Sequence, residues 1–162
     1  MGAGPSQPFV IQHVLSDKFV HVLSNGKDNN FPLVFNIGVH RKMVFEFEPS
    51  EDDDEYGFIK HVATGRYIHP YGGSEESEDN TPLVLYEDKH PGCLFNVDQE
   101  TGLIKHRGGR YFAPALGHSH PVSYLGLVLL SDPEERSQFR FADPENIGAE
   151  IQVACDSDSG EE

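Results

Sequence analysis

A chain of 162 residues is long enough for one domain that buries its own core, and a second folded domain is not expected. Its 12 basic residues against 27 acidic ones give a formal charge of -15, which excludes the basic clusters that nucleic acid or heparin would need. The 2 cysteines exclude a disulfide framework, and no stretch reaches the roughly 18 apolar residues of a membrane span. We therefore expect a soluble chain without membrane insertion, cytoplasmic or secreted without a recognisable signal peptide.

Short apolar runs follow one another along the chain in an order that occurs three times. Each copy contains the same series of runs, which are Phe9–His13, Lys18–His21, Pro32–Phe35 and Val44–Phe47; then Phe58–His61, Arg66–Pro70, Pro82–Leu85 and Leu94–Val97; and finally Leu103–His106, Arg110–Pro114, Gly126–Leu129 and Gln138–Phe141. Apolar and polar residues alternate in the last run of each copy, as in a strand with one buried face. Turn signals such as Ala63-Thr-Gly65 and Arg107-Gly-Gly109 separate the runs.

The repeats predict an all-β protein with the β-trefoil fold. Three units are too few to close a propeller, which has about four to eight blades, but they can close a six-stranded barrel capped by hairpins. No helix of useful length fits. We expect the folded domain over residues 9–143, with repeats at about 9–56, 57–101 and 102–143, a flexible N-terminus at 1–8 and an acidic C-terminal tail at 144–162.

Aligned positions of the three copies carry the predicted core. They are Ile11, Ile59 and Ile104 together with Phe45, Phe95 and Phe139, which we expect to meet near the pseudo-threefold axis. His13, His61 and His106 also recur once per copy and could indicate a three-histidine metal site. Equivalent residues of the three units lie far apart unless they are on the axis, so we interpret these histidines as structural.

The second copy contains a denser polar motif. It reads His69-Pro-Tyr-Gly-Gly73, then Asn80, and then Asp88-Lys-His90. A sugar presents neighbouring hydroxyls that both donate and accept, so a sugar site needs donors and acceptors fixed at short spacing. The aspartate would supply a charged acceptor, the two imidazoles would serve neighbouring hydroxyls, and the glycines would let the backbone approach the sugar ring.

This motif resembles that of the mytilectins, the galactose-binding β-trefoil lectins of mussels, whose units carry a His-Pro-x-Gly-Gly loop and a later Asp-x-His. The resemblance extends from residue 9 to about 142. It implies an R-type-like lectin for galactose- or N-acetylgalactosamine-terminated glycans on glycoproteins or glycolipids, with a role in innate immunity or cell recognition. The sugar-binding residues that it implies are His69, Pro70, Gly72, Gly73, Asn80, Asp88 and His90.

The other two copies keep only part of the motif. The retained or substituted positions are His21 and His40 in the first copy, and Pro114, Gly117, Asp132 and Glu134 in the third. Gly38 stands in place of Asp88, and Ala113 in place of His69. We therefore expect one intact site and two degenerate ones. A single monosaccharide site binds at about millimolar strength, so avidity would have to come from a homodimer or from an extended pocket.

Four polar clusters suggest other chemistry, and they are Asp52–Asp54, Asp88 with His90, Asp132 with Glu134, and His118 with His120. The aspartate run lacks the glycine-containing spacing of a calcium loop, and the Asp-x-His pair lacks a third zinc ligand or a nucleophile. We expect no metal, no cofactor and no enzymatic activity. The alternative function is that of a sugar-independent β-trefoil module for protein interaction.

Overall fold

The computed structural model of the chain describes residues 4–22, 31–36, 43–71, 79–89, 91–115 and 126–144. Its strands are β1 (Val10–His13), β2 (Phe19–Val22), β3 (Phe31–Asn36), β4 (Phe45–Pro49), β5 (Gly57–His61), β6 (Tyr67–Pro70), β7 (Thr81–Tyr86), β8 (Phe95–Asp98), β9 (Leu103–His106), β10 (Tyr111–Pro114), β11 (Leu127–Leu130) and β12 (Phe139–Ala142). Short 3-10 turns include η2 (Pro91–Cys93) and η4 (Glu135–Ser137). Every strand overlaps one of the apolar runs of the sequence, so the predicted order of strands is confirmed.

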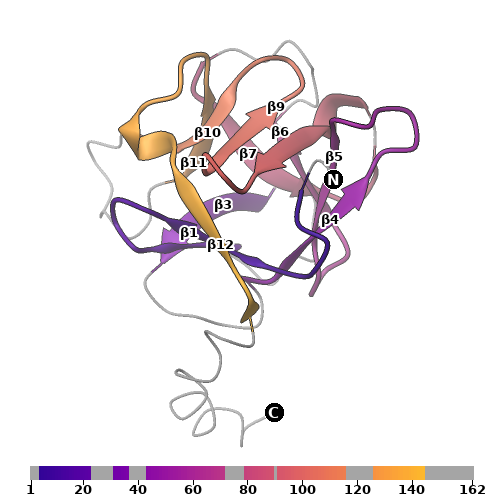
Figure 1. Cartoon of the computed structure of the whole chain (residues 1–162), viewed down its shortest axis with the longest axis horizontal. Coiled ribbons are helices and arrows are strands. Elements are labelled where there is room, and N and C mark those ends of the chain that lie inside the picture. Colours follow the sequence, from indigo (N-terminus) through magenta and orange to yellow (C-terminus); the bar gives the residue numbers. More distant parts are fainter. Residues whose placement is uncertain are drawn as a thin grey trace, which may run out of the picture.

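Three antiparallel strand pairs form the barrel (Figure 1). The pairs are β1 with β12, β4 with β5, and β8 with β9. They are joined at equivalent places in the repeats, namely by the bridges Phe9–Phe45 and Gly57–Phe95 and by the Phe139 amide, which donates to the Gly102 carbonyl at 2.8 Å. Gly102 has a φ of 79°, and a Cβ there would lie 2.6 Å from the Phe139 carbonyl oxygen. Glycine is therefore required where this part of the barrel closes.

The remaining strands form three hairpins, which are β2–β3, β6–β7 and β10–β11. β7 joins the hairpins because it pairs with both β3 and β11. A bridge between Val34 and Gly126 connects β3 to β11 and completes the triangle. A barrel of three strand pairs with a triangle of hairpins is the β-trefoil that the sequence predicted.

The core fills the barrel and the space beneath the hairpins. The six aligned positions are buried, with exposures of 0% for Ile11, Ile59, Ile104, Phe45 and Phe95 and 2% for Phe139. Phe112 from β10 packs edge-on against Phe95, with ring centroids 5.2 Å apart, and against Phe139 at 6.5 Å. Burying each such side chain contributes about 1.5–3 kcal/mol. The predicted core is confirmed.

His13 connects the first repeat to the third. Its Nδ1 accepts from the Ser16 hydroxyl at 2.8 Å, and its Nε2 donates to the Arg136 carbonyl at 2.9 Å. The ring also packs against Phe139, with centroids 5.4 Å apart. Burial lowers the pKa of His13 below its ordinary value of 6.5; the positive charges of Arg136 and Lys18 act in the same direction, and the hydrogen bond to the carbonyl opposes them.

The other two aligned histidines are buried in the same manner. His61 Nδ1 lies 2.8 Å from the Thr64 hydroxyl. His106 Nε2 donates to the Gly92 carbonyl at 2.8 Å, which is a contact between repeats like that of His13. Within the described ranges, no three His, Cys, Asp or Glu side chains gather in a way that could hold a metal ion. The contacts of the histidines are those of structural residues.

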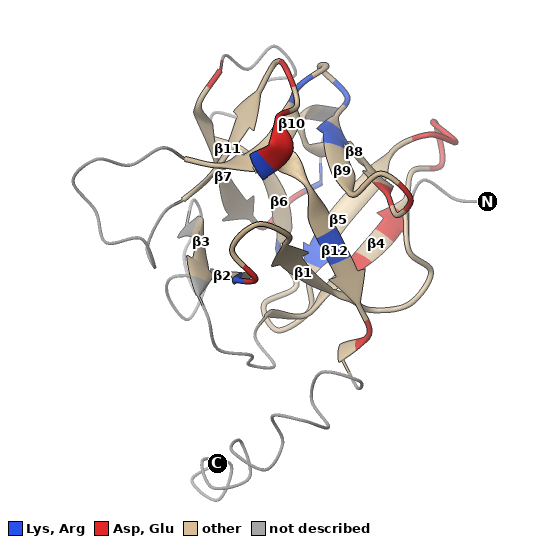
Figure 2. Cartoon of the chain, turned by 60° about the vertical axis from the view of Figure 1, so that its left-hand side comes forward, with Lys and Arg blue, Asp and Glu red and all other residues tan. Residues whose placement is uncertain are grey.

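Charged side chains are distributed over the surface. Acidic residues lie on several separate loops and on β4, with basic residues between them (Figure 2). Arg140 on β12, for example, lies 3.7 Å from the Asp17 carboxylate. In the part of the chain that the structure describes, no helix has the length and apolar character needed to cross a membrane.

Candidate functional site

The first half of the candidate site lies at the end of β6. His69 pairs across the hairpin with Val84, and its side chain is only 3% exposed. Its Nδ1 donates to the Pro70 carbonyl at 2.8 Å, and its ring stands edge-on to Tyr86 at 4.8 Å between centroids. Because Nδ1 carries the proton, the neutral ring has its lone pair on Nε2. Packing and the hydrogen bond together determine both the orientation and the tautomer of this imidazole.

The second half of the candidate site lies on the segment that follows β7. The chain bends at Glu87 and Asp88, and both residues are exposed. It then returns to the hairpin, because η2 packs against β6. The His106 bond to the Gly92 carbonyl fastens η2 to the third repeat. The segment that carries Asp88 therefore begins at the end of β7 and ends beside the strand that carries His69.

Three of the predicted site residues, Gly72, Gly73 and His90, lie outside the described residues. Pro70 is buried at the end of β6, and its carbonyl is the acceptor for His69. The structure thus packs η2, which follows Asp88-Lys-His90 in the sequence, against the strand that carries His69 and Pro70. The geometry of the complete pocket is a prediction.

Asn80 lies at the boundary between the second and third repeats. It is exposed, its φ of 67° is in the left-handed region, and its amide donates to the Leu129 carbonyl at 2.7 Å. Asparagine tolerates this conformation better than most residues. Its neighbour Asp79 accepts from Arg110 Nε at 2.8 Å and from the Ser131 amide at 2.9 Å, and these bonds, Arg110 first, lower the pKa of Asp79.

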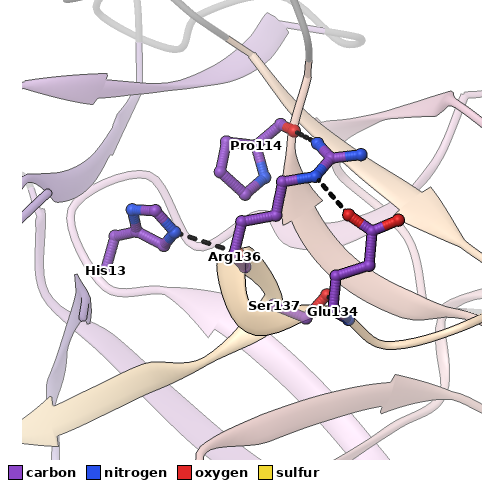
Figure 3. Close-up of polar contacts among 5 residues, drawn as sticks. All are labelled: His13, Pro114, Glu134, Arg136 and Ser137. Carbon is purple, nitrogen blue, oxygen red and sulfur yellow. Dashed lines mark hydrogen bonds and ion pairs between the residues drawn. The ribbon is translucent and has the colours of Figure 1, made fainter. Parts of the chain in front are cut away.

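The third repeat uses the corresponding groups for internal contacts (Figure 3). Arg136 Nε donates to the Glu134 carboxylate at 2.8 Å, and Arg136 Nη1 donates to the carbonyl of Pro114. The Glu134 amide also donates to the Ser137 hydroxyl at 3.0 Å. Asp132 is exposed, and Gly117 lies outside the described residues. The carbonyl that His69 engages in the second repeat is engaged by a guanidinium here.

The first repeat supplies less to compare. His21 is half-buried on β2 opposite Val34, whereas Gly38 and His40 lie outside the described residues.

The alternative polar clusters have ordinary surface contacts where they are described. Asp53 accepts from the Glu55 amide at 2.9 Å and lies 3.6 Å from Arg107, so this aspartate is part of a turn and an ion pair. Glu134 is paired with Arg136, as described above. His118 and His120 lie outside the described residues.

Sequence reasoning missed two cations beside the candidate sites. Arg136 in the third repeat is equivalent to Gly92 in the second, because the backbone carbonyl of each accepts a hydrogen bond from Nε2 of a core histidine. Lys89 stands inside the Asp-x-His motif and reaches β4, with its Nζ 3.3 Å from Glu48 Oε1. Nothing in the charge pattern separates these two side chains from other surface cations, since their roles depend on how the chain returns after β7 and β11.

Comparison with known proteins identifies the relatives of this chain. The MytiLec family, described as alpha-D-galactose-binding lectin, matches residues 9–144. A galactose-binding lectin of Crenomytilus grayanus is 47% identical over 49 residues, which are 28% of this chain and 33% of that protein. A galactose-binding lectin of Mytilus californianus is 43% identical over 49 residues, again 28% of this chain and 33% of the relative. Each of these matches therefore spans about a third of the relative's length.

Solved structures share the fold at low sequence identity. The designed threefold-symmetric protein ThreeFoil has a TM-score of 0.71 and 12% identity, with 84% of this chain and 98% of that chain covered. The C-half of the earthworm R-type lectin, in complex with GalNAc, has a TM-score of 0.61 and 8% identity, with the same coverage of 84% and 98%. These likenesses support the trefoil fold alone. The family match covers most of the sequence, and the chain therefore belongs to the MytiLec family of alpha-D-galactose-binding lectins.

Proposed function

We propose that this chain binds galactose- and N-acetylgalactosamine-terminated glycans through one site in its second repeat. The residues assigned to the site are His69, Pro70, Gly72, Gly73, Asn80, Asp88 and His90. The proposal is carried by the family match together with the return of the chain after β7, which brings η2 against β6. Lectins bind sugars without converting them, so the family assignment agrees with the prediction that the chain is not an enzyme.

The described residues offer the chemistry that a sugar requires. Asp88 carries an exposed carboxylate, and hydroxyls form shorter and stronger hydrogen bonds to a charged acceptor than to a neutral one. His69 has its tautomer determined by the bond to the Pro70 carbonyl, so its Nε2 is the acceptor nitrogen of the neutral ring. Both groups accept hydrogen bonds, so in this proposal each receives the proton of a different hydroxyl, which suits neighbouring hydroxyls of galactose.

The decisive experiment compares Asp88→Ala with Asp132→Ala, its counterpart in the third repeat. Both residues are exposed, and we expect both variants to keep their free energy of unfolding within about 0.5 kcal/mol. Asp88→Ala should abolish retention on a galactose resin, whereas Asp132→Ala should be retained like the parent protein. Retention of Asp88→Ala would contradict the assignment. A parent chain that binds no glycan on an array would instead favour the protein-interaction module.

The partners we propose are glycoproteins and glycolipids with terminal galactose-type sugars. One monosaccharide site binds at about millimolar strength, so useful avidity needs either a homodimer or contacts to the penultimate sugar. Light scattering of the purified chain distinguishes monomer from dimer. A glycan array tests the second route, because an extended site should discriminate between glycans that share the terminal sugar, and competition by free N-acetylgalactosamine tests whether that sugar is accepted.

A further inference from the structure

Lys89, between Asp88 and His90 in the sequence, directs its side chain toward the barrel. Its Nζ lies 3.3 Å from Glu48 Oε1 on β4. The same ammonium lies 5.3 Å from the ring centroid of Phe58 on β5 and 5.8 Å from that of Tyr67 on β6. One side chain from the segment after β7 therefore contacts three preceding strands.

The three groups that receive the ammonium also contact one another, and we call Glu48, Phe58 and Tyr67 the lysine cage. Phe58 and Tyr67 stand edge to face with centroids 6.1 Å apart. Burial raises the pKa of Tyr67, and the nearby charge of Glu48 acts in the same direction. Glu48 Oε1 is buried and has no hydrogen-bond partner within the described residues, so the Lys89 ammonium, 3.3 Å away, is the cation that compensates its charge. The cage combines an ion pair with two cation–π contacts.

The cage occurs in the one repeat that keeps the complete sugar motif. The positions equivalent to Lys89 hold Val39 in the first repeat and Pro133 in the third, and neither can form these contacts. In the second repeat the segment is fastened at Lys89 and again at the Gly92 carbonyl. Asp88 lies directly between the end of β7 and the first of these anchors.

We propose that Lys89 is a positioning residue for the sugar site: by binding the lysine cage, it holds the segment after β7 so that Asp88 faces the ligand. This inference rests on the proposed function. Each contact is partly exposed, with 45% of the Lys89 side chain and 39% of the Glu48 side chain accessible, so the anchor contributes little to global stability. It acts by ordering a short segment before the sugar arrives, which reduces the entropy lost on binding.

The test compares Lys89→Met and Lys89→Arg by calorimetric titration with D-galactose. Methionine keeps the apolar stem and removes the charge, and we expect its Kd to rise about three- to tenfold with an almost unchanged melting temperature. Arginine keeps the charge and the cation–π contact and should restore the parent Kd. Lys105→Met on β9 removes a positive charge outside the cage and should leave the Kd unchanged. Equal losses in all three variants, or no loss in Lys89→Met, would overturn the proposal.

Hydrogen exchange without sugar separates this proposal from the proposed function. The amides of residues 87–90 and of Gly92 should exchange faster in Lys89→Met than in the parent protein and at the parent rate in Lys89→Arg. If the parent protein binds no galactose but the exchange rates follow this pattern, Lys89 orders the segment and the proposed sugar-binding function is wrong. If galactose binds but exchange in this segment is the same in every variant, Lys89 does not position it.

Discussion

The second and third repeats have the same backbone arrangement, but different side chains donate to the carbonyl at the end of their second strand. In both, a 3-10 turn packs against the middle strand of the repeat, η2 on β6 and η4 on β10. In both, the carbonyl at the end of that strand receives a hydrogen bond, from His69 to Pro70 in one case and from Arg136 to Pro114 in the other. The backbone acceptor needs a donor whether or not the repeat binds a ligand, because a buried carbonyl without a partner is costly.

This difference explains how the third repeat can keep the fold without keeping the residues of the predicted pocket. Ala113 replaces His69 and offers no donor, and Arg136 replaces Gly92 and supplies one. The same guanidinium holds Glu134, which stands where the second repeat has a histidine. In the third repeat, Arg136 bonds to Glu134 and to the Pro114 carbonyl, whereas we propose that the second repeat uses the corresponding region to bind a sugar.

Replacing Arg136 should give the largest loss of stability among the variants that test this comparison. Arg136→Ala leaves the Pro114 carbonyl and Glu134 without their donor, and the arginine side chain is only 17% exposed. Hydrogen bonds to charged groups contribute about 1.5–3 kcal/mol each, so we expect the free energy of unfolding to fall by about 1–3 kcal/mol in urea titration. Galactose affinity should not change, since the proposed sugar site lies in the second repeat.

Arg140→Ala is the matched control for that loss. Arg140 belongs to the same repeat, its side chain is 55% exposed, and its ion pair with Asp17 has a length of 3.7 Å. Exposed pairs of this kind contribute about 0–1 kcal/mol, so its removal should change stability little. If the two arginine variants lost the same stability, the contacts of Arg136 would not be the reason for its effect.

A smaller effect should appear in the titration of His13, which donates to the Arg136 carbonyl. Burial first, and then the nearby cations, hold the pKa of His13 below 6.5 in the folded chain. Well above pH 6.5, His13 is neutral in both the folded and the unfolded chain. As the pH falls below 6.5, His13 is protonated first in the unfolded chain, so the free energy of unfolding decreases until the pH reaches the folded pKa. His13→Gln should flatten stability profiles between pH 8 and 5, and Arg136→Ala should raise the pKa of His13 measured by NMR. An unchanged pKa in that variant would contradict the contribution of the guanidinium.

The smallest effect concerns Asp79, which links the second repeat to Arg110 and Ser131 of the third. The Arg110 bond, followed by the Ser131 bonds, lowers the pKa of this carboxyl from 3.8. Its contribution to stability is present above the ordinary pKa and is lost as the pH falls through the lower folded value. We expect Asp79→Asn to be slightly less stable than the parent at pH 7, with the difference disappearing in acid and shrinking in high salt. A constant difference at all pH values would exclude an electrostatic origin.

Much of the fold could be predicted because the repeat places identical residue types at identical positions. Ile11, Ile59 and Ile104 are apolar in every copy, and all three are fully buried. The interpretation of the aligned histidines as structural also agrees with the structure, although the sequence could not identify the Arg136 carbonyl as a partner of His13, because that contact joins residues 123 positions apart.

The residues of the candidate site could be predicted from the sequence motif, but their contacts in three dimensions could not. The residue types of Asp88 and His69 indicate hydroxyl recognition, and the structure shows that η2, just after the Asp88 segment, packs against β6. The contacts of Lys89 with Phe58 and Tyr67 could not be predicted, since they depend on the direction in which the chain leaves β7. Asn80 was assigned from its place in the motif, whereas its backbone contact with Leu129 places it at the boundary with the third repeat.

The pairing of β1 with β12 has a consequence for how this protein is made. Val10 pairs with Ala142 and His13 with Phe139, so β1 leaves the ribosome before the other strands of this domain and meets its partner only when β12 has emerged. Until then one edge of β1 has no neighbour in the barrel, and pairings between distant segments form slowly. Closure of the barrel by β1 and β12 should therefore be a late step in the folding of this domain.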